Sequence, residues 1–337
     1  MIDETIAPER LADCLAVVEA GLGLDSAAVR GIAPQTGGLF NYLLRVDTTQ
    51  GTYFFKQYLD DVPNPLYSPP RIPAAERAEL AGRVQMLAAA CSTQEVPEIV
   101  AFDRRRCAFL MTAASGDEPL NAYLARGEQP RAVLTELPRA LAGLHQSTHH
   151  RFPPDSLFAN TAFRDFKLRL QYDDITAHLT PPETERVLAC RRAYQARTDC
   201  VTHGDLNSRN ILATDTALGI IDFEQSHLGT PAYDLAYLLC ELLISMETAG
   251  AGDRVARTIA EFLDHYCAYF TAASRDSVET EMTQHLAVQT LYRFWGPSRA
   301  AWTSYVDEAC RERIIARARA LLMATGPVTA VLADLRN

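Results

Sequence analysis

The chain has 337 residues, of which 48% are hydrophobic, and a formal net charge of −10 at pH 7. This length and composition are enough for a large core in two domains or lobes, so disorder is not expected. The acidic balance argues against a nucleic-acid partner, because nucleic-acid-binding proteins carry basic surfaces that neutralise phosphates.

The sequence lacks the patterns of secretion, membrane insertion and structural disulfides. The opening decapeptide MIDETIAPER is acidic and has no basic start before an apolar core. No apolar run approaches the ~18 residues that a membrane span requires. The eight cysteines are scattered, with no Cys-x-x-Cys pair. We therefore expect a cytoplasmic protein with reduced thiols and no membrane partner.

The first third of the chain alternates strand patterns with turns. A Pro-rich connection at residues 61–73 leads into an Ala-, Glu- and Leu-rich segment that ends near Ala90 and has the composition of a helix. Five apolar runs around it have the length and composition of strands: 29–33, 41–46, 52–58, 98–102 and 107–113. We predict a five-stranded antiparallel sheet with one inserted helix.

The rest of the chain has a mainly helical character. Long helical segments are predicted at residues 130–147, 182–197, 232–247, 254–272, 278–294 and 307–324. A small sheet followed by a larger helical region indicates an α+β protein with two lobes. We expect the smaller lobe to span residues 1–113 and the larger lobe residues 114–337.

A polar segment interrupts the helical pattern with two motifs, VTHGDLNSRNIL at residues 201–212 and GIIDFEQ at residues 219–225. Short apolar runs bound both motifs, and loops on a rigid scaffold are where reacting groups concentrate. Phosphoryl transfer from ATP needs a carboxylate for the attacking hydroxyl and oxygen ligands for Mg²⁺. Asp205, Asn210 and Asp222 supply these residue types.

The spacing of the two motifs is specific. His-Gly-Asp is followed by an Asn five residues after the Asp, and Ile-Asp-Phe-Glu begins 16 residues after the Asp. Together they resemble the aminoglycoside phosphotransferase and choline kinase family, a relative of the protein kinases. The resemblance implies a bilobal protein-kinase-like fold and an ATP-dependent kinase that phosphorylates an alcohol group. It assigns Asp205 as the catalytic carboxylate and Asn210 and Asp222 as the Mg²⁺ ligands.

Four other polar residues have less decided roles. By the same resemblance, His203 braces the loop and His145 is structural. Glu224 either joins the metal or substrate environment or is a solvated carboxylate. Asp234 opens an apolar helix after a proline, and in related kinases an Asp at this place holds the catalytic loop, so both interpretations of Asp234 are structural.

The resemblance also gives roles to the predicted sheet and helix. Lys56 lies on the third predicted strand, where the family carries the lysine that contacts the α and β phosphates. Such a lysine needs an acidic partner on the following helix. Glu76 and Glu79 share a helix face and are both candidates, and we favour Glu79.

Two further segments of the smaller lobe are assigned to the nucleotide. Gly37, Gly38 and Asn41 join the first two strands, where the family has a loop over the phosphates and glycine permits close backbone approach. The apolar stretch containing Met111 and Ala113 matches the hinge that binds adenine in the family. Met111 is equally compatible with core packing.

The identity of the acceptor is left open by the sequence. The smaller lobe is most similar to methylthioribose kinases, in GLFNYLLRV at 38–46, FFKQ at 54–57 and VPEIVAFD at 96–103. The segment after Glu224 is unlike theirs. Aminoglycosides, sugars such as methylthioribose and amino alcohols therefore all stay as candidate acceptors.

Acceptor contacts are expected from the helical lobe. The candidate segments are an insertion at residues 150–170 and a segment that contains Arg293, Trp295 and Arg299. The residues of this second segment are equally compatible with core or surface positions.

Two alternatives to a small-molecule kinase agree less well with the sequence. A nucleotide-binding pseudokinase scaffold predicts loss of the Lys, Asp, Asn and Asp set, yet all four residues are present. A protein kinase predicts an activation segment ending in Ala-Pro-Glu after Asp222, which the sequence lacks.

Overall fold

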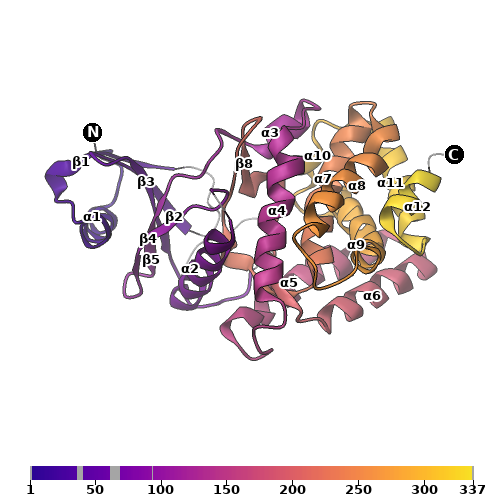
Figure 1. Ribbon diagram of the computed structural model, residues 1–337, viewed down its shortest axis with the longest axis horizontal. Coiled ribbons are helices and arrows are strands. Elements are labelled where there is room, and N and C mark those ends of the chain that lie inside the picture. Colours follow the sequence, from indigo (N-terminus) through magenta and orange to yellow (C-terminus); the bar gives the residue numbers. More distant parts are fainter. Residues whose placement is uncertain (1, 36–40, 61–68, 93, 336–337) are drawn as a thin grey trace.

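The computed structural model describes residues 2–35, 41–60, 69–92 and 94–335. Figure 1 shows two lobes side by side, one built around a sheet and one mainly of helices. The bilobal α+β architecture predicted from the sequence is therefore confirmed. None of the helices in the described ranges combines the length and apolar character that a membrane span requires.

The five-stranded sheet has the strand order β1-β2-β3-β5-β4, and every neighbouring pair is antiparallel. Its strands are β1 (Val29–Pro34), β2 (Asn41–Thr48), β3 (Thr52–Tyr58), β4 (Ile99–Asp103) and β5 (Ala108–Thr112). They coincide with the five apolar runs of the sequence.

Helices α1 (Pro8–Leu22) and α2 (Ala74–Cys91) cover opposite faces of this sheet. Successive strand residues point to opposite faces, so Leu110 packs with the α1 side and Phe109 with the α2 side. By the same alternation on β3, Lys56 points to the α2 side, toward the other lobe.

The helical lobe contains five short strands and ten helices within the described residues. The strands are β6 (Glu118–Pro119), β7 (Cys200–Thr202), β8 (Ile211–Ala213), β9 (Leu218–Ile220) and β10 (His227–Gly229). The helices are α3 (Leu120–Ala125), α4 (Arg131–Thr148), α5 (Thr161–Leu168), α6 (Pro181–Gln195), α7 (Pro231–Thr248), α8 (Val255–Cys267), α9 (Arg275–Trp295), α10 (Arg299–Thr303), α11 (Glu308–Met323) and α12 (Val328–Asp334).

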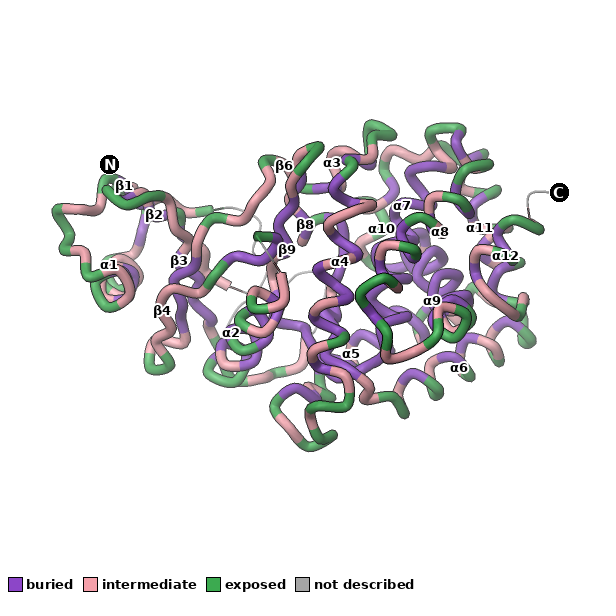
Figure 2. The backbone as a smooth tube through the Cα atoms, in the orientation of Figure 1, coloured by how far each residue is buried: buried purple, intermediate pink, exposed green. Residues whose placement is uncertain are grey.

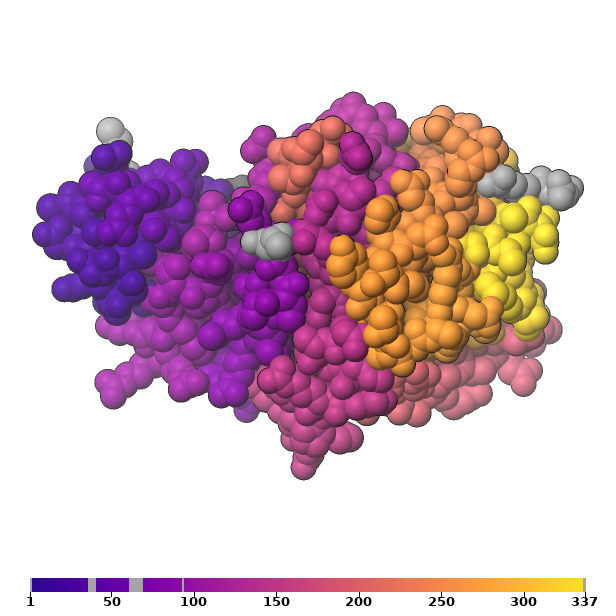
Figure 3. Space-filling view, viewed as in Figure 1, coloured from indigo at the N-terminus to yellow at the C-terminus, as the bar shows by residue number. Residues whose placement is uncertain are grey.

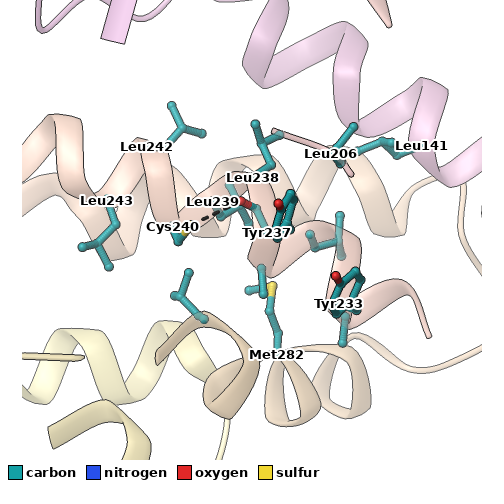
Figure 4. Packing of buried hydrophobic residues seen from close by; sticks show 14 of the residues in the cluster. Leu141, Leu206, Tyr233, Tyr237, Leu238, Leu239, Cys240, Leu242, Leu243 and Met282 are labelled. Atoms are coloured by element: carbon teal, nitrogen blue, oxygen red, sulfur yellow. Dashed lines mark hydrogen bonds between the residues drawn. The ribbon is translucent and has the colours of Figure 1, made fainter. Parts of the chain in front are cut away.

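The core of this lobe is organised around α7, in which every residue from Pro231 to Met246 is buried. The burial-coloured trace shows this helix enclosed by its neighbours (Figure 2). Figure 4 shows its side chains gathered with Met282 of α9, Leu141 of α4 and the loop residue Leu206. Dense packing of this kind fixes the position of any polar side chain on α7.

The chain passes from one lobe to the other between β5 and β6. In the space-filling view (Figure 3), the N-terminal residues form one end of the molecule and α11 and α12 the other. β6 pairs with β8, which forms a hairpin with β9. The connection therefore runs directly to the segment that carries the polar motifs.

Gly116, in this connection, is expected to be intolerant of a side chain. Its φ is +98°, and an added Cβ would lie 2.5 Å from the carbonyl carbon of Leu212. Strain at such a φ costs about 1–3 kcal/mol, and the clash adds to it. We expect Gly116→Ala to lower the free energy of unfolding, measured in urea, by more than Gly250→Ala does.

Gly250 is the matched control, because it has a φ of +71° but no atom within 4 Å of an added Cβ. Equal destabilisation by the two substitutions would show that the close approach of Gly116 to β8 contributes nothing.

Candidate active site

The loop after β7 carries the HGDLNSRN motif, and one face of α7 holds it in place. Asp234 accepts hydrogen bonds from the backbone N–H groups of His203 (2.6 Å) and Gly204 (3.0 Å). Three residues on, the Tyr237 hydroxyl donates to Asp205 (3.1 Å), and Glu241 accepts from the backbone N–H and hydroxyl of Ser208. Residues at this spacing share a helix face, so α7 fixes the loop at three points.

His203 and His145 are both fully buried and support the loop. The Nε2 of His203 lies 3.0 Å from the carbonyl oxygen of Ile221, and its Nδ1 accepts from the Asp205 N–H (3.3 Å). His145 lies 3.2 Å from the Asp234 carboxylate and 2.9 Å from the Tyr266 hydroxyl. Neither imidazole is directed toward open space, which agrees with the structural roles expected for them.

The Asp205 carboxylate is surrounded by four donors. Oδ1 forms an ion pair with Lys167 and accepts the Tyr237 hydroxyl. Oδ2 accepts from the side-chain amides of Asn210 (3.1 Å) and Gln225 (3.4 Å). A carboxylate has about four lone-pair positions, so the side chain is held in one orientation.

Asn210 and Asp222 lie next to each other at the base of the β8–β9 hairpin. Asn210 precedes β8 and Asp222 follows β9 closely, and the N–H of Ile221 donates to the carbonyl of Asn210 (2.9 Å). Asp222 has a φ of +71°, a left-handed conformation that is uncommon for a residue other than glycine. The backbone thus turns sharply at the residue predicted to bind metal.

Lys56 reaches across from β3 and forms an ion pair with Asp222, with 2.6 Å between Nζ and Oδ1. Burial is the largest single effect on the pKa of Lys56 and would lower it, but the charge and hydrogen bond of Asp222, together with smaller effects of Tyr58 and Glu224, hold the pKa above its ordinary value. Burial would raise the pKa of Asp222, but Lys56 holds it below the ordinary value. Both groups are therefore charged at neutral pH.

Glu224 is buried beside this pair. Its carboxylate accepts from the side-chain amide of Asn41 (2.8 Å) and lies 3.5 Å from Arg77 of α2. Burial and the nearby charge of Asp222 raise the pKa of Glu224 to about 7 against the opposing effect of Lys56. Of the two interpretations of Glu224, the solvated carboxylate is wrong.

The predicted partner of Lys56 is corrected by the structure. Glu79 pairs with Arg83 and Arg104, and Glu76 is exposed. The side chain of α2 that faces Glu224 is Arg77. The rotation of α2 about its axis directs Glu76 and Glu79 away from Lys56. Among the described residues Lys56 pairs with Asp222, so the expected pair with Glu79 is not formed.

The other residues predicted to bind the nucleotide lie in different surroundings. Met111 is nearly buried and its sulfur accepts from the Gln85 side chain (3.4 Å), so its side chain packs in the α2 core. Ala113, after β5, is exposed. Gly37 and Gly38 lie outside the described residues.

The three side chains considered for the acceptor have different surroundings. Arg293 is fully buried and pairs with Glu241 (2.6 Å), the residue that holds Ser208. Trp295 stacks on His178 with 5.0 Å between ring centroids, and Arg299 is exposed. Arg293 therefore supports the HGDLNSRN loop through Glu241.

Three residues at the site were not predicted from the sequence: Lys167, Tyr237 and Gln225. A readable signal existed for Tyr237, because Asp234, Tyr237 and Glu241 repeat at helical spacing in an otherwise apolar helix. Lys167 lies in the segment 150–170 that was expected to contact the acceptor, but nothing in the sequence singled it out within that segment, because it is 38 residues from Asp205.

The donor set at the hairpin fits a magnesium ion. Among the described residues no group of three His, Cys, Asp or Glu side chains forms a complete metal site. Mg²⁺ is usually held by one or two carboxylates together with water and substrate phosphates, not by a full protein cage. One ionised carboxylate, Asp222, beside the amide of Asn210 matches that pattern.

The buried Glu224 predicts a pH effect on stability. The folded state keeps a proton on Glu224 up to about pH 7, whereas an ordinary glutamate loses it near 4.5. The wild type therefore loses stability through this group as pH rises from about 4.5 to 7. Glu224→Gln removes that loss, so its free energy of unfolding should rise relative to the wild type, by up to about 3 kcal/mol.

The comparison is made by urea unfolding at several pH values without nucleotide or magnesium. The difference in free energy of unfolding between the two proteins cancels the contributions of His227 and His285. Burial lowers the pKa values of these two histidines, so their effect on stability with rising pH is opposite to that of Glu224. A difference that stays constant with pH would contradict a raised pKa.

Comparison with known proteins gives a sequence match and several structural matches. The sequence pattern of a family described as the phosphotransferase enzyme family, APH, matches residues 32–278. A methylthioribose kinase from Geobacillus thermodenitrificans is 27% identical over 97 residues, which are 29% of this chain and 24% of that enzyme. The chain thus matches about a quarter of the length of that relative.

Three solved structures share the fold over nearly their whole length. A choline/ethanolamine kinase family protein from Mesorhizobium loti is 20% identical, covers 96% of this chain and 99% of its own, and has a TM-score of 0.53. Choline kinase from Cryptosporidium parvum is 12% identical, with a TM-score of 0.54, and the match covers 96% of this chain and 99% of that one. An aminoglycoside phosphotransferase from Alicyclobacillus acidocaldarius is 15% identical, with a TM-score of 0.52, and the match covers 99% of this chain and 96% of that one. At these identities the matches show the fold alone.

Proposed function

We propose that this chain, which belongs to the phosphotransferase enzyme family, transfers the γ-phosphoryl group of ATP to a hydroxyl group of a small molecule. The observation that carries the proposal is the contact of Lys56 with Asp222 across the two lobes, beside Asn210 and Asp205. Phosphoryl transfer needs this combination of a cation for the nucleotide phosphates, oxygen ligands for a metal and a carboxylate for the acceptor.

In the proposed reaction Asp205 orients the acceptor hydroxyl and accepts its proton while the oxygen attacks the γ-phosphorus. Lys56 contacts the α and β phosphates. Asn210 and Asp222 would hold Mg²⁺, which when bound neutralises charge on the β and γ phosphates. The hydrogen bonds from α7 keep the loop rigid, so that little reorganisation is needed when substrates bind.

We assign the nucleotide to the lobe of residues 1–113 and the acceptor to the lobe of residues 114–337. The glycine pair at 37–38 and Asn41 would cover the phosphates. The segment with Met111 and Ala113 would hold the adenine, through its backbone, since the Met111 side chain is packed in the core.

The relatives suggest three classes of acceptor: amino alcohols such as choline, aminoglycosides, and sugars such as methylthioribose. The test is to incubate the protein with MgATP and a panel of aminoglycosides, choline, methylthioribose, homoserine and sugars, and to follow ATP consumption. We expect an acceptor that drives consumption by the wild type and not by Asp205→Asn. Binding of MgATP without consumption across the panel would instead favour the nucleotide-binding scaffold.

A further inference from the structure

Lys167 lies on α5, outside both sequence motifs, yet its side chain ends at the centre of the site. The residue is 7% exposed, and its ammonium forms an ion pair with Oδ1 of Asp205. It also donates to the Tyr237 hydroxyl at 3.3 Å. A lysine is almost never buried to this extent without a partner.

The ammonium is held in one position by its surroundings. The centre of the Tyr237 ring lies 5.1 Å from Nζ of Lys167 and 4.5 Å from the Arg293 guanidinium. Tyr237 itself is fixed by the packing of α7. Burial is the largest single effect on the pKa of Lys167 and lowers it, but the charge and hydrogen bond of Asp205, together with smaller effects of nearby tyrosines, raise the pKa above its ordinary value, so the group stays cationic.

Lys167 contacts one of the two oxygens of the Asp205 carboxylate. In the proposed function the hydroxyl group of the acceptor binds to one of these two oxygens. All four lone-pair positions of Asp205 have donors, from Lys167 and Tyr237 on Oδ1 and from Asn210 and Gln225 on Oδ2. An incoming hydroxyl must displace one of them. If Tyr237, Asn210 or Gln225 is displaced, the acceptor hydroxyl binds to the same carboxylate as the Lys167 ammonium. If Lys167 is displaced, the hydroxyl binds where the ammonium was.

The carboxylate that Lys167 contacts is also joined to the metal side of the site. Oδ2 of Asp205 accepts from the side-chain amide of Asn210 (3.1 Å), and Asn210 lies beside Asp222 at the base of the β8–β9 hairpin. The transferring phosphoryl group passes between the acceptor and the metal-bound nucleotide, which is the region between these two carboxylates.

We propose that Lys167 is a catalytic residue whose ammonium contacts the transferring phosphoryl group or the attacking oxygen on the acceptor side. The bond from the γ-phosphorus to the β–γ bridging oxygen breaks as the bond to the acceptor oxygen forms, and the acceptor's proton passes to Asp205. Lys167 stays protonated and stabilises the negative charge on the phosphoryl oxygens. The inference rests on the proposed function.

Such a cation is valuable because it is fixed before the reaction. Preorganised donors aimed at developing charge act strongly in a site from which water is excluded, and loss of one costs about 10²–10³-fold in kcat. A salt bridge with only a structural role would give a different result, since its loss changes stability and leaves the affinity for a phosphoryl-transfer analogue unchanged.

The experiment measures binding of MgADP with and without aluminium fluoride, which mimics the transferring phosphoryl group and requires no knowledge of the acceptor. Transition-state analogues bind more tightly than ground-state ligands. We expect aluminium fluoride to raise the affinity of the wild type for MgADP by roughly tenfold or more. Lys167→Met should lose this gain while its affinity for MgADP alone stays within about twofold to threefold of the wild type.

Two further variants separate charge from structure. Lys167→Gln still donates a hydrogen bond to Asp205 but carries no charge, and it should behave like Lys167→Met. Lys167→Arg keeps the charge and should recover part of the gain. Arg169→Met is the matched control, because Arg169 is an exposed cation just beyond α5, and it should behave like the wild type.

Three outcomes would overturn the inference: a full gain in folded Lys167→Met, rescue by Gln equal to that by Arg, or no gain from aluminium fluoride in a wild type that binds MgADP. A wild type that binds neither MgATP nor MgADP would refute the proposed function itself. If Lys167→Met does not fold, the comparison of Lys167→Gln with Lys167→Arg decides the question.

Discussion

Asp205→Asn is expected to reduce the rate of phosphoryl transfer by about 10²–10⁴-fold once an acceptor is identified. The substitution keeps the shape of the side chain but replaces the oxygen that accepts the hydroxyl proton. The new amide oxygen can still accept from Tyr237, and Asn210 keeps its hydrogen bond to the backbone carbonyl of residue 205 (2.9 Å), so the loop should retain its conformation. The ion pair of Lys56 and Asp222, which we propose to hold the nucleotide and the metal, is untouched.

The measurement combines steady-state rates with a binding assay. The kcat of Asp205→Asn should fall, whereas its dissociation constant for MgATP should stay close to that of the wild type. Asp165→Asn is the control, because Asp165 is a half-exposed aspartate on the same helix as Lys167 and should give wild-type rates. Undiminished turnover by Asp205→Asn would remove Asp205 from its proposed role.

The architecture was largely predictable because it depends on local periodicity. The five sheet strands and the helices α4, α6, α7, α8, α9 and α11 follow from apolar runs and helical spacing, which are properties of neighbouring residues. Helix α1 was not predicted, although Pro8 at its first turn and Gly23 in a left-handed conformation at its end are readable signals. The lobe boundary at residue 113 stays a prediction.

The site was predictable where its residues lie in one continuous segment. Asn210 and Asp222 flank a single hairpin, and their neighbourhood follows from the chain itself. Contacts between distant segments were not predictable. Lys167 meets Asp205 through the packing of α5, and α2 presents Arg77 where an acidic residue was expected. Rotation of a helix about its axis depends on tertiary packing, which residue counting along a Pro-rich connection does not capture.

The buried pair of Arg293 and Glu241 predicts the largest effect on stability. Arg293 is fully buried, donates twice to Glu241 and lies between the rings of Tyr237 and Trp302. Removing one partner of a buried pair leaves an uncompensated charge, which costs about 3–5 kcal/mol. We expect Arg293→Met to lower the free energy of unfolding by that amount in urea denaturation.

A double variant separates the loss of the pair from the loss of packing. Arg293→Met combined with Glu241→Gln leaves no isolated charge, so it should be more stable than Arg293→Met alone. Arg299→Met is the matched control at an exposed arginine and should change stability by no more than about 0.5 kcal/mol. If Arg293→Met were no more damaging than this control, the pair would not be a major source of stability. Because Glu241 also holds Ser208, the loss of Arg293 should lower kcat in the folded fraction too.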